Sequence, residues 1–305
     1  MTLLSISRLE RDTSPVFIVG EARSGSTILY RVLQKHSAFR GPKENLQESK
    51  IMTSIDELAS VLGPQQPKSM FRYMADERSY DEFRKSVAPI RSMLKIGEDV
   101  MRRLDSSSGK YRIWVATGHP LAVRSYFYHA RQAHQVDRVL EKTPNAVMQV
   151  NRLRRCYPNA KFIYIHRHPV DVYASYVSLS KVDEKFRWAR IPMSEFAYRW
   201  RVRSKCAIAF ARKIPESFSL LSYEQFTSEP DETIKRLCEF LGEDFDPDMV
   251  VEEEPNKNYR MGAPHLYGEI TTKTKEWQDH VTARQAAELQ KKVRPVMREL
   301  AYPLY

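Results

Sequence analysis

Residues 15–27 constrain the fold of this chain most, because they place an apolar run, a glycine-containing loop and a helical pattern in direct succession. The apolar run covers residues 16–19 and ends at Gly20, and an apolar face with helical spacing begins at Thr27. A strand that leads through a tight loop into a helix suits a phosphate group, since loop amides and the positive end of the helix attract an anion. The sequence therefore predicts an α/β fold with an anion site at the end of its first strand.

The loop differs at one position from the nucleoside-triphosphate pattern G-x-x-x-x-G-K-[ST]. Gly20 and Gly25 have the required separation, but Ser26 stands where the lysine belongs. That lysine neutralises the β- and γ-phosphates of ATP or GTP. Its absence, with Arg23 inside the loop, indicates a different phosphate-like ligand. A kinase-like nucleotide enzyme of the same fold class is therefore an alternative that the sequence disfavours.

A second segment supplies further phosphate-binding groups. Residues 161–166 are β-branched and aromatic, which is typical of a buried strand, and Arg167 follows directly. Pro169 then suits the first turn of a helix. Ser175 lies eight residues after Arg167. An arginine at a strand end and a serine two helical turns later can converge on one phosphate.

These two segments resemble motifs of sulfotransferases that use 3′-phosphoadenosine 5′-phosphosulfate (PAPS). Residues 20–27 resemble their 5′-phosphosulfate loop, and residues 167–175 resemble their 3′-phosphate motif, with His168 where Asp or Asn is more common. The resemblance covers nearly the whole chain and is to bacterial members, with some similarity to tyrosylprotein sulfotransferases. It implies that the phosphosulfate and the 3′-phosphate are bound by Arg23, Ser24, Gly25, Ser26, Thr27, Arg167 and Ser175.

The resemblance extends to four further positions. Lys142, in Glu-Lys-Thr-Pro, resembles the family lysine near the leaving oxygen and lies 25 residues before Arg167. The resemblance implies that Lys142 and Arg23 are catalytic. The alternative is that Lys142 is an exposed surface lysine. Tyr223 resembles the tyrosine that approaches the nucleotide. Lys273 and Lys275 correspond to the segment that closes over PAPS, although the Arg-Lys-Gly signature of the cytosolic enzymes is missing there, so a solvated charge run is equally compatible.

The general base is the least determined residue. Cytosolic small-molecule sulfotransferases carry a histidine just after the lysine-bearing strand, but Pro144 occupies that place here. Tyrosylprotein sulfotransferases and many bacterial relatives instead have a glutamate after the first helix, where Glu44 falls in this chain. A carboxylate near a dehydrated site can accept a proton. The alternatives are Glu48, followed by His36, His119 and His166.

The order of predicted elements gives one domain, residues 1–305, with a helical insertion at about 45–135. Strands are predicted at 16–19, 111–117, 137–141, 161–166 and 217–223, and the helices that alternate with them include 194–213, 230–242 and one from 282. This alternation predicts a P-loop-type three-layer α/β fold with a central parallel sheet and helices on both faces. In such sheets ligands bind at the carboxyl ends of the strands, where Gly20, Lys142, Arg167 and Tyr223 are expected.

Composition narrows the class of protein further. The formal net charge is +11, which suits a PAPS site and leaves open an anionic acceptor, an anionic surface or a generally solvated basic face. Three widely spaced cysteines favour free thiols in a reducing compartment. No signal peptide, membrane span or metal pattern is visible in the sequence, so we expect a cytoplasmic enzyme that needs no metal.

The sequence thus predicts a PAPS-dependent O-sulfotransferase that forms PAP and a sulfate ester. The acceptor hydroxyl can belong to a carbohydrate, a lipid, a natural product or a peptide. A different class of protein, a non-catalytic module that binds an anionic polymer or nucleic acid, remains an alternative. Such a module would need basic residues interleaved with exposed aromatic residues. This chain has only a small group of that kind, formed by Arg152, Arg154, Arg155 and Tyr157. We therefore expect no nucleic acid as a partner.

Overall fold

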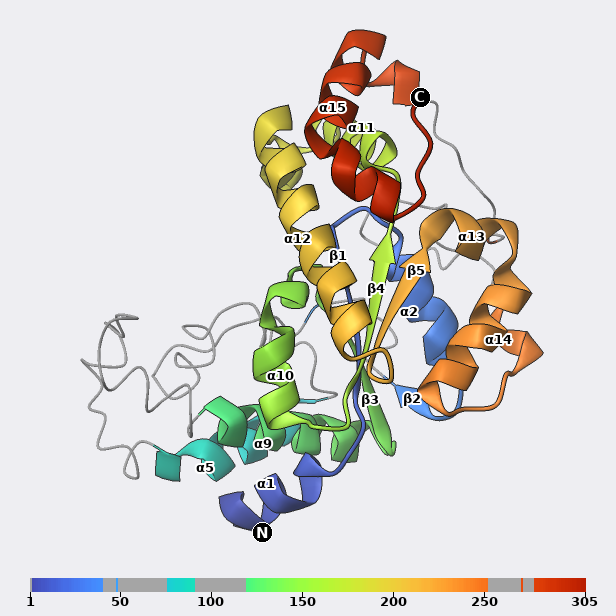
Figure 1. Cartoon of the computed structure of the whole chain (residues 1–305). Helices are drawn as coiled ribbons and strands as arrows, with labels where there is room; N and C mark the ends of the chain where they lie inside the picture. The colour runs from blue at the N-terminus through green and yellow to red at the C-terminus, as the bar shows by residue number, and fades with distance from the viewer. Residues whose placement is uncertain (1, 41–47, 49–75, 91–118, 252–269, 271–276) are drawn as a thin grey trace. The chain divides into compact units, whose positions relative to one another are not determined.

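The structure, a computed structural model, describes residues 2–40, 48, 76–90, 119–251, 270 and 277–305 (Figure 1). The chain divides into two compact units that interleave in sequence. The first unit consists of Met1–Ile18 and Tyr30–Phe162, and the second of Val19–Leu29 and Ile163–Tyr305. The prediction of one domain with an insertion at 45–135 stays a prediction.

The strands form one sheet with the order β2-β3-β1-β4-β5. Their bounds are β1 Val16–Gly20, β2 Phe39–Arg40, β3 Arg138–Lys142, β4 Lys161–His166 and β5 Phe218–Ser222. β3 pairs in parallel with both β1 and β2, and Ile18 of β1 is in register with Lys142. All five residues of β1 are buried, as expected for a strand covered on both faces. The predicted P-loop-type three-layer α/β fold with a central parallel sheet is confirmed.

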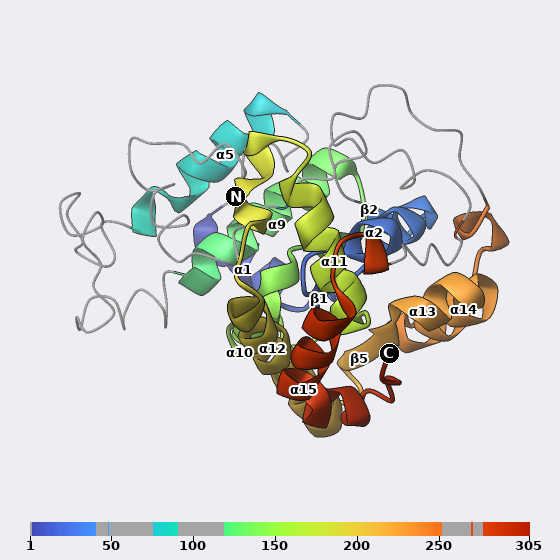
Figure 2. The same cartoon turned by 90° about the horizontal axis from the view of Figure 1, so that it is seen from above.

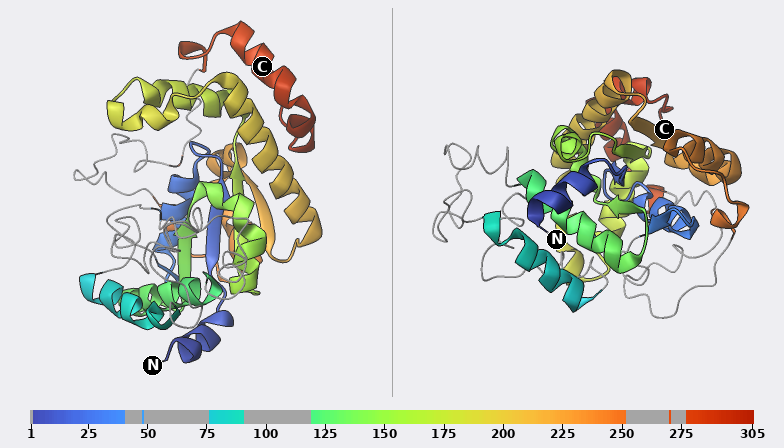
Figure 3. Two further views of the ribbon diagram at one scale, coloured as in Figure 1. Left: turned by 90° about the vertical axis from the view of Figure 1, so that its left-hand side faces the viewer. Right: turned by 90° about the horizontal axis from the view of Figure 1, so that it is seen from below.

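The helices of the first unit gather around α9 (His119–His134). This helix packs against α1 (Leu3–Arg11) and α5 (Glu77–Val87), as Figures 1 and 3 show. Edge-to-face contacts of Phe127 with Phe17 of β1 and with Tyr126 build the core there. The unit also contains η2 (Pro144–Gln149) and α10 (Val150–Cys156).

The second unit is mostly helical. Its elements are α11 Pro169–Ser180, η3 Glu184–Ala189, α12 Met193–Lys213, α13 Tyr223–Ser228, α14 Pro230–Leu241, η4 Pro247–Met249, η6 Trp277–Asp279 and α15 Ala283–Glu299. α12 and α15 lie side by side, and α13 and α14 lie on the other side of β5 (Figure 2). Trp200 of α12 and Leu289 and Val293 of α15 belong to one buried apolar cluster with α11 residues. α2 (Ser26–Lys35) begins in this unit and continues into the first.

Several helix ends follow their sequence signals. Gly242 ends α14 in the left-handed conformation, with φ of 76°. Thr282 and Gln285 form a capping box at the start of α15. The predicted strand at 111–117 lies outside the described residues.

The structure adds two local features to the elements named above. The segment after β3 begins as the 3₁₀ helix η2, and α10 starts only at Val150. A helix, α1, occupies part of the N-terminal stretch for which we predicted no element. In the described part of the chain, no helix combines the length and apolarity needed to cross a bilayer.

Candidate functional site

The loop between β1 and α2 is built on two glycines that accept close neighbours. A Cβ at Gly20 would lie 2.6 Å from the backbone oxygen of Ile165 on β4. Gly25 has φ of +95°, and a Cβ there would lie 2.3 Å from Cδ2 of Tyr223. Both positions exclude a side chain, so the glycine spacing of the motif lets β4 and the Tyr223 ring press against the loop.

Arg23 has a strained backbone inside this loop. Its φ is 72°, a left-handed conformation that costs a residue other than glycine about 1–2 kcal/mol. Its Nε donates a hydrogen bond of 3.0 Å to Oγ of Ser175 on α11. The arginine predicted to bind the 5′-phosphosulfate and the serine predicted to bind the 3′-phosphate are thus in direct contact.

Hydroxyl groups and helix amides complete the loop. Ser24 is 1% exposed, and its Oγ has no hydrogen-bond partner among the described residues. Buried hydroxyls are normally paired, so this one is suited to an anion. Ser26 and Thr27 open α2, whose first intrahelical bond runs from the Leu29 amide to the Gly25 carbonyl at 3.1 Å. The first amides of a helix have no intrahelical acceptor and favour negative charge.

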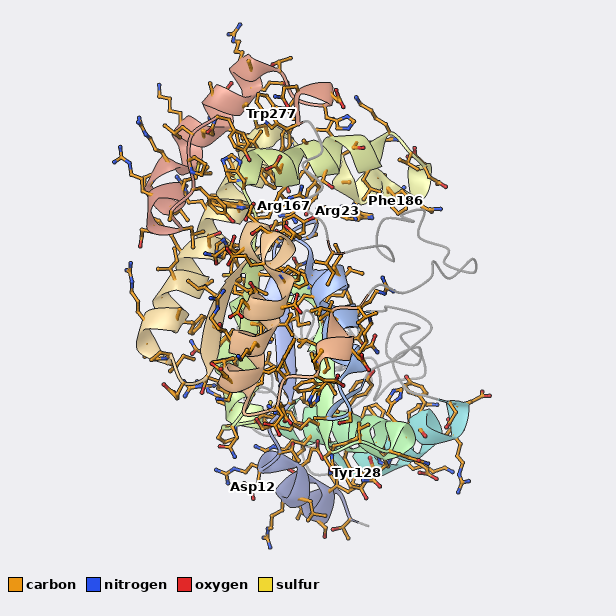
Figure 4. All side chains as sticks on the ribbon, turned by 90° about the vertical axis from the view of Figure 1, so that its right-hand side faces the viewer. Asp12, Arg23, Tyr128, Arg167, Phe186 and Trp277 are labelled. Carbon is orange, nitrogen blue, oxygen red and sulfur yellow. The ribbon has the colours of Figure 1, made fainter. Side chains whose placement is uncertain are left out.

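Arg167 and Tyr223 lie against the same loop. Arg167 follows β4 directly and is 9% exposed, with its guanidinium carbon 4.4 Å from the centre of the Tyr223 ring. Figure 4 labels Arg23 and Arg167, which lie close together at this end of the sheet. Burial, and then the positive charge of Arg167, lower the pKa of Arg23. Two neighbouring guanidinium groups in a partly dehydrated place are electrostatically suited to a multiply charged anion.

The contacts of His168 explain why a histidine fits the position where the resembled motif more often has Asp or Asn. It is the N-cap of α11, and its Nδ1 accepts a hydrogen bond of 3.3 Å from the Val170 amide. Asp and Asn are favoured N-caps because a side-chain acceptor bonds to such an amide. Burial lowers the pKa of His168 to about 4, which keeps the ring neutral and its nitrogen able to accept. The imidazole therefore performs the capping function of the residues it replaces.

Lys142 belongs to the first unit and has a carboxylate partner. Its Nζ lies 3.0 Å from Oε1 of Glu48, and the side chains are 8% and 32% exposed, respectively. The structure thus places the second candidate base beside the predicted catalytic lysine. Glu44, Lys273 and Lys275 lie outside the described residues.

The three histidines considered as bases are engaged in packing. His119 is buried beside Sγ of Cys156, and burial lowers its pKa to about 3. His166 Nδ1 is 2.6 Å from the hydroxyl of Tyr302, and burial lowers its pKa to about 4. His36 Nδ1 accepts a hydrogen bond from the amide of Ala38. Each of these histidines thus has a packing or hydrogen-bond partner in the structure.

The C-terminal residues contact the segment 167–175, which the sequence did not indicate. The Tyr305 hydroxyl donates a 2.7 Å hydrogen bond to Asp171, and the Tyr305 ring stacks on His168 with centroids 3.8 Å apart. Burial raises the pKa of Asp171, and the bond from Tyr305 opposes that shift. No sequence pattern links residues this far apart.

Metal-ligand side chains do not gather in the described residues, where no group of three or more His, Cys, Asp and Glu side chains is placed to hold an ion. The three cysteines are free; Cys156 and Cys238 are buried and Cys206 is half-buried.

Residues 15–247 match the sequence model of the Sulfotransferase family. A curated relative, an uncharacterized protein of Aquifex aeolicus (strain VF5), is 24% identical over 235 residues, which are 74% of this chain and 25% of that protein. The chain therefore spans about a quarter of the length of this relative.

Three solved structures share the fold. The sulfotransferase domain of the Synechococcus PCC 7002 olefin synthase has a TM-score of 0.63 at 20% identity and covers 97% of both chains. The sulfotransferase domain from the curacin biosynthetic pathway has a TM-score of 0.56 at 17% identity, over 97% of this chain and 100% of that one. Sulfotransferase STF9 from Mycobacterium avium has a TM-score of 0.51 at 14% identity, over 96% and 78%.

Proposed function

Because the chain belongs to the sulfotransferase family, we propose that it transfers a sulfuryl group from PAPS to an acceptor hydroxyl and forms PAP and a sulfate ester. One observation carries the proposal: the loop arginine, Arg23, contacts Ser175 of the second motif and lies next to Arg167. Two phosphate motifs that are 140 residues apart in the sequence are therefore neighbours in the second unit. A nucleoside-triphosphate enzyme has no need for the second motif.

The residues of the second unit fit the charges of PAPS. The 5′-phosphosulfate suits Arg23, the first amides of α2 and the Ser24 hydroxyl, which has no partner among the described residues. Arg167 and Ser175 suit the 3′-phosphate, since guanidinium groups form charge-assisted bonds to phosphate oxygens. Tyr223 contacts the loop at Gly25 and lies under the Arg167 guanidinium, which suits the tyrosine that the resemblance brings near the nucleotide.

Bound PAPS supplies the activated sulfuryl group, and the protein supplies positioning and charge. We assign to Lys142 the stabilisation of negative charge on the leaving oxygen. A glutamate accepts the proton of the acceptor hydroxyl: Glu44 by the family resemblance, or Glu48, which the contact with Lys142 favours. The acceptor belongs to one of the four classes named above, and the net charge of +11 supports an anionic one. We place the enzyme in the cytoplasm on the evidence of its free cysteines.

The decisive experiment compares PAP with adenosine 5′-phosphate, which lacks only the 3′-phosphate. Arg167→Ala removes a charge-assisted bond worth about 1.5–3 kcal/mol, so PAP should bind about 10–150 times more weakly. Adenosine 5′-phosphate should keep most of its affinity, and Arg167→Lys should keep part of the preference for PAP. Isothermal titration calorimetry measures both ligands, with ATP as the comparison for the kinase alternative. An unchanged ratio of the two affinities in Arg167→Ala would refute the 3′-phosphate assignment.

A further inference from the structure

A buried carboxylate sits inside the candidate phosphosulfate loop. Glu21 follows Gly20 directly and is 1% exposed. Its Oε1 accepts a hydrogen bond of 2.7 Å from the Tyr176 hydroxyl and one of 3.3 Å from Arg199. Its Oε2 forms a close ion pair with Arg203. Both oxygens are thus engaged by groups from α11 and α12, and the carboxylate is a structural junction of the second unit.

A negative charge next to an anion site would by itself weaken anion binding. Here Arg199 and Arg203 offset it, since Glu21 contributes −1, the two arginines contribute +2 and the exposed Glu195 beside Arg199 contributes −1, so the cluster carries no net charge. Burial and the nearby Glu21 charge raise the pKa of Tyr176, which keeps its hydroxyl protonated as a donor. The carboxylate therefore adds no net repulsion to the anion site. Its contribution to the site is to hold the loop in a defined geometry.

The geometry connects Glu21 to Arg23. The Ser24 amide donates to the Glu21 carbonyl at 3.3 Å, which closes a turn with Arg23 as its third residue. The left-handed φ of Arg23 suits that turn position, which glycine normally occupies. Two successive residues of α11 hold the turn, because Ser175 accepts from Arg23 and Tyr176 donates to Glu21.

We propose that Glu21 is a positioning residue of the donor site: bound to Tyr176 and Arg203, it holds the strained turn that directs the Arg23 guanidinium and the loop amides at the 5′-phosphate. This inference rests on the proposed PAPS-binding function. It assigns the buried network a role in one subsite, the 5′ one. An anchor that only joined α11 to α12 would influence both phosphate subsites equally.

Two ligands separate these roles. PAP carries the 5′- and 3′-phosphates, whereas adenosine 3′-phosphate lacks the 5′-phosphate. In Glu21→Gln the affinity for PAP should fall by about tenfold or more, since charge-assisted bonds of this size are lost when the loop is displaced. The affinity for adenosine 3′-phosphate should stay within about twofold, because Arg167 is unaltered. Titration calorimetry on the full chain measures both, and exchange of the loop amides should become faster in the variant.

Matched controls exclude a general loss of stability. Glu10→Gln removes another 1% exposed glutamate that is paired with an arginine, Arg131, in the first unit. It should lower the unfolding free energy without changing the ratio of the two affinities. Glu195→Gln breaks the exposed 3.8 Å contact of Arg199 and should leave both affinities unchanged. If Glu21→Gln does not fold, Tyr176→Phe removes one hydrogen bond to Glu21 and should shift the ratio in the same direction.

The outcomes are distinguishable. A wild-type chain that does not bind PAP would overturn the proposed function and the inference together. A wild-type chain that binds PAP, with Glu21→Gln or Tyr176→Phe weakening both ligands equally or neither, would overturn the positioning role and leave the proposed function intact.

Discussion

Gly25→Ala tests the packing of the candidate donor loop most directly. Gly25 has φ of +95°, and an added Cβ would lie 2.3 Å from Cδ2 and 2.9 Å from Cε2 of Tyr223. The ring cannot move freely, because it is also packed under the guanidinium of Arg167. The alanine therefore meets a backbone penalty and a steric penalty at once.

The two penalties can be separated with a second glycine of the same unit. The left-handed backbone costs alanine about 1–2 kcal/mol, and overpacking against a held ring costs about 1–3 kcal/mol. Gly25→Ala should therefore lower the unfolding free energy by about 2–5 kcal/mol. Gly242 has a similar φ of +76°, but a Cβ there would meet no atom of the described residues within 4 Å. Gly242→Ala should show the backbone penalty alone.

Urea unfolding gives the two free energies, and PAP titration gives the functional effect. We expect weakened PAP binding only in Gly25→Ala, since only there is Tyr223 displaced. In a Tyr223→Ala background the added cost of Gly25→Ala should drop to that of Gly242→Ala. Equal costs of the two glycine substitutions in the wild-type background would show that Tyr223 does not press on the loop as described.

Three other outcomes are expected. If Glu48 is the general base, Glu48→Gln should reduce turnover by about 10²–10⁴ without weakening the binding of PAP. If Glu44 is the base, Glu44→Gln should have this effect instead. The pH–rate profiles of the two variants distinguish these cases, because only the variant that lacks the base loses the acidic limb of the profile. Tyr305→Phe removes a bond that favours ionised Asp171, so the Asp171 pKa should rise further in a carboxyl NMR titration. Burial lowers the pKa of His119 from 6.5 to about 3, so the folded state loses stability as the pH falls below 6.5. Between pH 7.5 and pH 5 the unfolding free energy should fall by about 2 kcal/mol from this residue. In His119→Phe this part of the pH dependence should vanish.

Local patterns were sufficient to predict the elements that carry the two motifs. The strand predicted at 161–166 is β4 with the same bounds, and Pro169 and Gly242 mark the ends of their helices. These features depend on neighbours within a few residues, such as a continuous run of β-branched and aromatic side chains, the fixed φ of proline or the left-handed freedom of glycine. The N-terminal helix α1 was missed, because its stability comes from packing against α9, more than 100 residues away in the sequence.

Contacts between segments that are distant in the chain could not be predicted from the sequence for the same reason. The motif predicts that Tyr223 approaches the nucleotide, but nothing in residues 15–27 shows that Gly25 makes room for its ring. The family resemblance places Glu44 ahead of Glu48 as the candidate base, and only the fold reveals that Lys142 has Glu48 as a partner. The contact of Tyr305 with Asp171 likewise depends on where α15 leaves the end of the chain.

The contacts of α11 give a physical reason for the spacing between Arg167 and Ser175. Asp171, Ser175 and Tyr176 of this helix bind Tyr305, Arg23 and Glu21, respectively, so one helix holds the C-terminal residues and the donor loop. Because α-helical residues advance by about 100° each, one inserted residue would rotate Ser175 and Tyr176 away from the loop while leaving Arg167 and the His168 cap in place. The eight-residue spacing of the motif is therefore a rotational requirement, because it keeps both hydroxyl groups facing the loop while the arginine stays at the end of β4.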